Sequence, residues 1–200
     1  MFNRIPRISR LCQGLVATAL LAVTSTSQSA AVSNASNSWN GDFSRLIDLT
    51  ATRLHVAREV ALTKWDTRKP IEDSEREGVV ISAAATQAEP AGVPRQLATH
   101  FFADQIEANK LVQYGLLARW HRAGKAPSDH RASLTDDIRP ELDRLQGEFI
   151  RELAATDALR AAPDCYARLA RATQSYSSAH KLDALYSVAL DRALARVCEK

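Results

Sequence analysis

Two basic side chains interrupt the apolar face of a segment whose pattern predicts a helix beginning near Phe43. On a helical wheel, Arg53 and Lys64 fall between two groups of apolar residues. They are eleven residues apart, which is about three turns and roughly 16 Å, so both can reach one ligand lying along the helix. Two cations on an inward-facing stripe indicate an anionic ligand. The alternative is that both side chains extend past the edge of the stripe to solvent, as long basic side chains readily do.

Two amide side chains lie on the apolar face of a later predicted helix. Asn109 and Gln113 are four residues apart, close to the line through Phe102 and Trp120. A buried amide without a partner costs about 1–3 kcal/mol, so neighbouring helices or a polar ligand must satisfy these groups. A purely structural hydrogen-bond network is the alternative to a ligand site.

A third polar group stands at the start of a shorter predicted helix. Asp73 and Glu77 suit the N-terminal end of a helix, where acidic side chains cap the backbone and complement the helix dipole. Arg76 does not suit that position, because a cation opposes the positive end of the dipole. We therefore expect Arg76 to have another partner.

The elements that must position these residues are all helices. Neither a strand with alternating hydrophobicity, nor a glycine-rich phosphate loop, nor an internal repeat is present in the sequence. Pro70 ends the first helix, and Pro140 is compatible only with the first turn of the fourth. The sequence predicts an all-α, single-domain bundle of about six helices, over residues 43–68, 75–89, 95–122, 138–153, 164–175 and 180–197.

The N-terminal residues 1–31 have the pattern of a secretory signal peptide, and residues 32–200 are expected to form the domain. Three arginines precede an apolar run at residues 14–23, and small residues follow at positions 27, 29, 30 and 31. That run is shorter than the roughly 20 apolar residues that a spanning helix needs. We expect a periplasmic or secreted protein that has no membrane contact once the signal is removed.

Charge and cysteine content exclude some classes of function. Removing the signal removes three of the 26 basic residues and leaves 23, equal to the 23 acidic residues, so the charge gives no reason to expect nucleic acid binding.

Cys12 leaves with the signal, and Cys165 and Cys198 of an exported chain are expected to form a disulfide. Two buried free thiols are the alternative. The sequence has no cluster of histidine or cysteine residues that could hold a metal ion, so no metal site is expected.

In their order along the chain, five motifs resemble those of the all-helical chorismate mutases, specifically the exported subclass. The motifs are LxDLxAxRL at residues 46–54, VAxxKW at 60–65, PIEDxxRE at 70–77, FFxDQIEANKxVQ at 101–113 and IRPxLDxL at 138–145. Together with the two C-terminal cysteines they cover nearly the whole mature chain. The resemblance implies rearrangement of chorismate to prephenate.

The resemblance also implies which side chains bind the substrate. Arg53, Arg76 and Arg139 would bind the two carboxylates of chorismate. Lys64 and Gln113 would be the catalytic donors to the ether oxygen of the breaking bond. Some exported members have a carboxylate where this chain has Gln113. Since a carboxyl group donates only when protonated, Gln113 should make activity less dependent on acidity.

Four further positions follow from the same resemblance. Glu77, with the backbone near Asp73, would bind the ring hydroxyl of the substrate. Asn109 lies where the family places a small polar residue that lines the pocket. Val80 stands where some members carry a polar contact, so here it is expected to form part of the wall.

The implied reaction is a concerted rearrangement that requires no nucleophile, acid, base, metal or cofactor. The resemblance implies a homodimer, with the pocket within one chain. Two alternatives remain: a pyruvate-releasing lyase acting on isochorismate, and a non-catalytic periplasmic protein that binds a dicarboxylate in the same basic pocket.

Overall fold

The computed structural model describes residues 42–199, so the predicted signal peptide and Cys12 lie outside the described residues. Residues 42–199 are mostly helical and contain no strand, which confirms the predicted all-α class. The elements are α1 (Ser44–Thr67), α2 (Ser74–Ala88), a 3-10 turn η1 (Glu89–Ala91), α3 (Arg95–Ala123), a π-helical turn η2 (Leu134–Ile138), α4 (Arg139–Ala155), α5 (Asp157–Ala161), α6 (Cys165–Ala179) and α7 (Ala184–Ala193).

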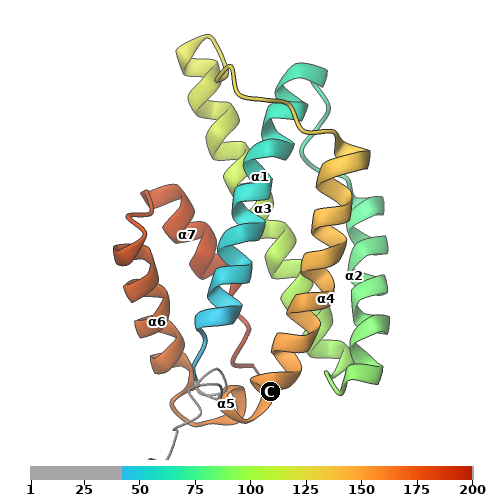
Figure 1. Ribbon diagram of the computed structural model, residues 1–200, viewed down its shortest axis with the longest axis vertical. Helices are drawn as coiled ribbons and strands as arrows, with labels where there is room; N and C mark the ends of the chain where they lie inside the picture. The colour runs from blue at the N-terminus through green and yellow to red at the C-terminus, as the bar shows by residue number, and fades with distance from the viewer. Residues whose placement is uncertain (1–41, 200) are drawn as a thin grey trace, which may run out of the picture. The chain divides into compact units, whose positions relative to one another are not determined.

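Helix α3 is central to the packing, because it contacts α1, α2 and α7. Figure 1 shows α2 and α4 on one side of α1, with α6 and α7 on the other. Three buried phenylalanines join α3 to α4: the ring centroids of Phe101 and Phe102 lie 5.2 and 6.2 Å from that of Phe149. Edge-to-face contacts of this kind add to the free energy of burial and fix the spacing of the two helices.

Local sequence signals set the helix ends near the candidate site. Arg68 follows α1 in a left-handed conformation with φ 53°, and Pro70 comes directly after the turn. Asp73 caps α2, its Oδ1 accepting a hydrogen bond of 3.1 Å from the backbone N–H of Arg76. Pro140 lies in the first turn of α4, as predicted.

The structure differs from the predicted elements in three places. α5 is an additional helix, and its five residues are too few to show a helical period in the sequence. η2 occupies a segment that mostly precedes the predicted fourth helix, and Ser133 caps it by accepting a hydrogen bond from the N–H of Asp136. The last helix spans Ala184–Ala193 rather than the predicted residues 180–197, and it starts late because Lys181 is left-handed and Asp183 supplies the cap.

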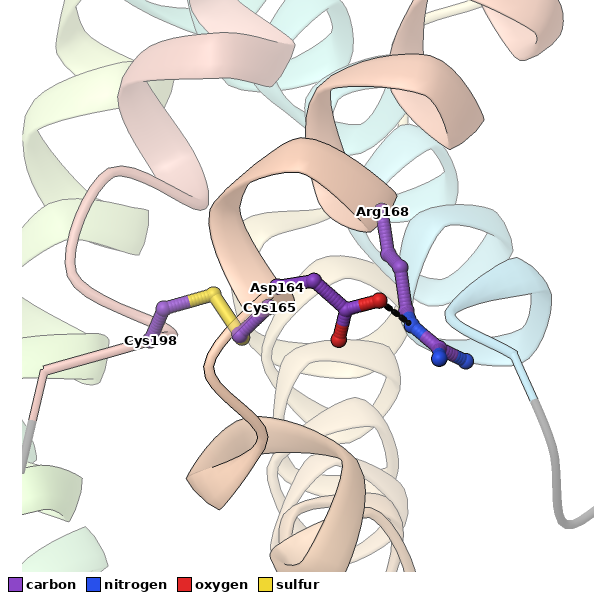
Figure 2. Close-up of a disulfide and its surroundings, with 4 residues drawn as sticks. All are labelled: Asp164, Cys165, Arg168 and Cys198. Atoms are coloured by element: carbon purple, nitrogen blue, oxygen red, sulfur yellow. Dashed lines mark hydrogen bonds and ion pairs between the residues drawn. A yellow bond between two sulfur atoms is a disulfide. The ribbon is translucent and has the colours of Figure 1, made fainter.

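The predicted disulfide between Cys165 and Cys198 is present, with the two Cα atoms 5.8 Å apart. Figure 2 shows the bond at the start of α6, beside the ion pair of Asp164 and Arg168. The two cysteines are 33 residues apart in the sequence, so the chain-entropy model gives a stabilisation of about 3–4 kcal/mol. Among the helices of residues 42–199, none has the length and apolar character needed to cross a bilayer.

The contact between α3 and α7 combines close packing with a buried ion pair. A Cβ atom on Gly115 would lie 2.6 Å from a terminal carbon of Leu185, so glycine permits the close approach. Asp104, only 1% exposed, pairs with Arg192 and with Arg196, whose Nη2 lies 2.6 Å from the carboxylate. These pairs attach the C-terminal segment to the helix that carries Asn109 and Gln113.

Asp104→Asn is expected to lower the free energy of unfolding by about 1–3 kcal/mol, because it leaves two arginines without their carboxylate. Urea denaturation followed by circular dichroism measures this difference. Asp183→Asn is the matched control: Asp183, the cap of α7, pairs with Arg119 of α3, both side chains are nearly half exposed, and asparagine keeps an oxygen that can cap the helix. It should cost no more than about 1 kcal/mol. Equal losses in the free energy of unfolding for the two variants would mean that the burial of Asp104 does not strengthen its ion pairs.

Candidate active site

One cavity of about 540 Å³ lies among α1, α2, α3, η2 and α4. All nine residues predicted to bind substrate line it, and none lies elsewhere: Arg53, Lys64, Asp73, Arg76, Glu77, Val80, Asn109, Gln113 and Arg139. Residues 68–138 separate the first of the helices that supply these residues from the last, so packing brings the predicted set together.

Arg53 supplies a buried cation to this cavity. The residue is 8% exposed, and its Nη1 has no hydrogen-bond partner within residues 42–199. Burial lowers the pKa of Arg53 to about 10, which still leaves the guanidinium charged at neutral pH. The sequence left open that Arg53 extends past the edge of the apolar stripe to solvent. Its low exposed fraction excludes this alternative for Arg53. A charged N–H group without a partner inside a cavity indicates an anionic ligand.

Lys64 lies beside the turn between α1 and α2. Its Nζ donates a hydrogen bond of 2.6 Å to the carbonyl oxygen of Ile71. Burial lowers the pKa of Lys64, although the negative charges of Asp73 and Glu77 partly oppose that shift. The carbonyl uses one of the three ammonium hydrogens, so the group retains donors for a ligand.

The two amides of α3 form a directed hydrogen-bond chain. Gln113 Nε2 donates to Asn109 Oδ1 at 2.6 Å, and Asn109 Nδ2 donates to the backbone oxygen of Arg53 at 3.3 Å. This direction orients the Gln113 amide. It also leaves Gln113 Oε1 buried and without a partner in the described chain. The alternative of a purely structural network therefore accounts for Asn109 but only in part for Gln113.

Arg76 and Arg139 add two further cations to the lining, from α2 and α4. Both residues are exposed, and the described chain provides neither guanidinium with an ion pair. The sequence suggested that Arg76 has a partner other than the helix end, but no protein group in residues 42–199 is that partner. Their exposed positions leave both guanidinium groups available to a ligand that enters the cavity.

The opposite charge in the cavity is concentrated on the N-terminal end of α2. Glu77 Oε1 accepts a hydrogen bond of 3.2 Å from the backbone N–H of Asp73, and Glu77 Oε2 accepts one of 3.0 Å from Lys110 Nζ. The sequence analysis did not single out Lys110, because nothing in its local spacing reveals a partner 33 residues earlier. Apolar side chains form the remaining wall: Val60, Ile71, Val80, Phe102, Ile106, Leu134, Ile138 and Leu142.

Comparison with known proteins shows the family to which the chain belongs. A family model described as chorismate mutase type II matches residues 44–114, which span α1 to α3. The secreted chorismate mutase of Mycobacterium tuberculosis is 32% identical over 158 residues, which is 77% of each chain. The chain belongs to the type II chorismate mutase family. The predicted class of enzyme, an isomerase, is thereby confirmed.

Solved structures of chorismate mutases share this fold. That of Burkholderia phymatum is 46% identical with a TM-score of 0.77, covering 79% of this chain and 96% of the other. That of Burkholderia thailandensis is 39% identical with a TM-score of 0.74, covering 78% and 98%. The Mycobacterium tuberculosis relative carries the name secreted chorismate mutase, in agreement with the predicted export of this chain.

For a chorismate mutase the residues of the cavity suit the chemistry. Residues 42–199 contain no group of three histidine, cysteine or acidic side chains that could hold a metal ion. What the cavity does provide is charged and amide donors at fixed positions. These can bind an anion and stabilise negative charge that develops within it.

Proposed function

We propose that the chain rearranges chorismate to prephenate in the cavity between α1 and α4. The observation that carries this proposal is the buried guanidinium of Arg53, whose Nη1 lacks a partner in residues 42–199. Chorismate is a dianion, and its enolpyruvyl arm must swing over the ring before the bonds rearrange. The cavity therefore has to bind two carboxylates and hold them in the compact conformer.

Three arginines would bind those carboxylates. Arg53 would reach them from α1, Arg76 from α2 and Arg139 from α4, so the three cations come from three different helices. A guanidinium binds a carboxylate through two parallel N–H groups, which fixes orientation as well as position. Holding the reacting ends together lowers the entropic part of the barrier.

Lys64 and Gln113 would stabilise the ether oxygen as its bond to the ring carbon breaks. Negative charge grows on this oxygen in the transition state, and donors already in place stabilise it without reorganising. The carbonyl of Ile71 and the amide of Asn109 hold the two donor groups before substrate arrives. Gln113 Nε2 keeps a second hydrogen for the ether oxygen. Asn109 then acts mainly by orienting Gln113.

The ring hydroxyl would bind at the start of α2. Glu77 still has lone pairs free after accepting from Asp73 and Lys110, so its carboxylate can accept the hydroxyl hydrogen. Val80, one turn further along α2, contributes apolar wall. We also propose that the enzyme is exported and forms a homodimer in which each chain carries a complete site.

A turnover assay tests this function. Protein beginning at residue 32 is mixed with chorismate, the loss of chorismate absorbance is followed, and the product is converted with acid to phenylpyruvate. Saturable formation of prephenate supports the proposal. Release of pyruvate in a parallel assay with isochorismate would assign a lyase instead, and binding of chorismate without its consumption would leave a dicarboxylate-binding protein.

A further inference from the structure

Lys110 connects the candidate hydroxyl-binding carboxylate to α3. Its Nζ lies 3.0 Å from Glu77 Oε2 and 2.7 Å from Glu107 Oε1. The side chains of Lys110 and Glu77 are only 12% and 21% exposed, whereas Glu107 is 48% exposed. The pair of Lys110 and Glu77 is therefore the better shielded from water, and a shielded ion pair is screened less by salt.

The two oxygens of the Glu77 carboxylate have different donors. The backbone N–H of Asp73 binds Oε1 from within the start of α2, and Lys110 binds Oε2 from α3. With one donor from its own helix and one from a neighbouring helix, the carboxylate plane cannot rotate without losing a hydrogen bond. Its orientation in the cavity thus depends on a residue from another element.

The charge of Lys110 matters as much as its position. Four carboxylates line the cavity: Glu72, Asp73, Glu77 and Asp143. A dianionic substrate that approaches Glu77 meets a like charge, which disfavours binding unless a cation compensates. Desolvation opposes the charge on Lys110, but the hydrogen bonds that Lys110 donates to Glu107 and Glu77, together with the negative charges of these carboxylates, outweigh it and raise the pKa of Lys110. The ammonium is therefore present at neutral pH.

We propose that Lys110 is a positioning residue for the rearrangement, which orients the Glu77 carboxylate toward the ring hydroxyl and offsets its charge against the dianionic substrate. This inference rests on the proposed function of the cavity and of Glu77. Lys110 itself need not touch the substrate. Its effect should pass through Glu77, and that dependence can be measured.

A double-mutant cycle between Lys110 and Glu77 tests the inference. Lys110→Met keeps the length of the side chain and removes its charge, and it should lower kcat/KM for chorismate by about tenfold, with KM rising because Glu77 becomes an uncompensated negative charge. Lys110→Arg should recover most of the loss. In a Glu77→Gln background the same Lys110→Met change should cost less than about threefold, since little charge remains to offset.

Thermal melting of every variant separates folding from catalysis, and Lys110→Gln provides a second uncharged variant if Lys110→Met folds poorly. Lys125→Met, just beyond α3 and away from the cavity lining, is the matched control and should retain full activity. Unchanged kcat/KM in folded Lys110→Met or Lys110→Gln would overturn the inference. So would an undiminished loss in the Glu77→Gln background. Absence of turnover in the unmodified enzyme would instead reject the proposed function.

Discussion

Lys64→Ala is expected to reduce kcat/KM for chorismate by a hundredfold or more. Removing one preorganised donor to a developing negative charge raises an activation barrier by about 3–4 kcal/mol. Lys64 is suited to this role because the carbonyl of Ile71 fixes its ammonium at 2.6 Å on the cavity wall. Steady-state kinetics at neutral pH measure the loss.

The pH dependence gives a second measure of the same residue. Burial lowers the pKa of Lys64, so the active cation should be lost on the alkaline side, below the pH at which an ordinary lysine titrates. The residual activity of Lys64→Ala should lack the part of the alkaline decline that Lys64 contributes, whereas the loss of charge on Arg53, whose pKa burial lowers to about 10, should remain. Lys125→Ala serves as the control for loss of a lysine at a position outside the cavity. A fully active Lys64→Ala enzyme would refute the assignment of Lys64.

Gln113→Glu is expected to lower activity at neutral pH by about a hundredfold and to make it rise again on acidification. An ionised carboxylate cannot donate to the ether oxygen, and it places negative charge where negative charge develops. A protonated carboxyl group can donate. Activity of the variant should therefore increase as pH falls through the pKa of the introduced glutamate, whereas the unmodified enzyme should show no such acid-dependent increase.

Profiles of kcat/KM against pH for the two proteins test this expectation. Gln174→Glu makes the same chemical change on the exposed face of α6, outside the cavity, and should leave the profile unaltered. Circular dichroism at each pH establishes that the variant remains folded. A Gln113→Glu enzyme with normal activity at neutral pH would mean that the amide does not donate to the ether oxygen.

The sequence by itself determined the helical class and the candidate residues of the site. The apolar period of α1 placed Arg53 and Lys64 on an inward stripe, and that of α3 placed Asn109 and Gln113 on another. Both inferences needed only the helical repeat, which is a local property of the chain. The two mature cysteines likewise predicted the disulfide from the expected compartment, and the structure contains it.

Only the tertiary structure decided which of these groups have protein partners and which remain available to a ligand. The helical wheel places Asn109 and Gln113 alike, yet Asn109 bonds to the backbone of Arg53 while Gln113 keeps an unpartnered oxygen. The pairing of Lys110 with Glu77 was equally absent from the sequence pattern. Whether a hydrogen bond forms between two helices depends on differences of a few tenths of an ångström in the distance between donor and acceptor. Residue spacing along the chain does not specify that distance.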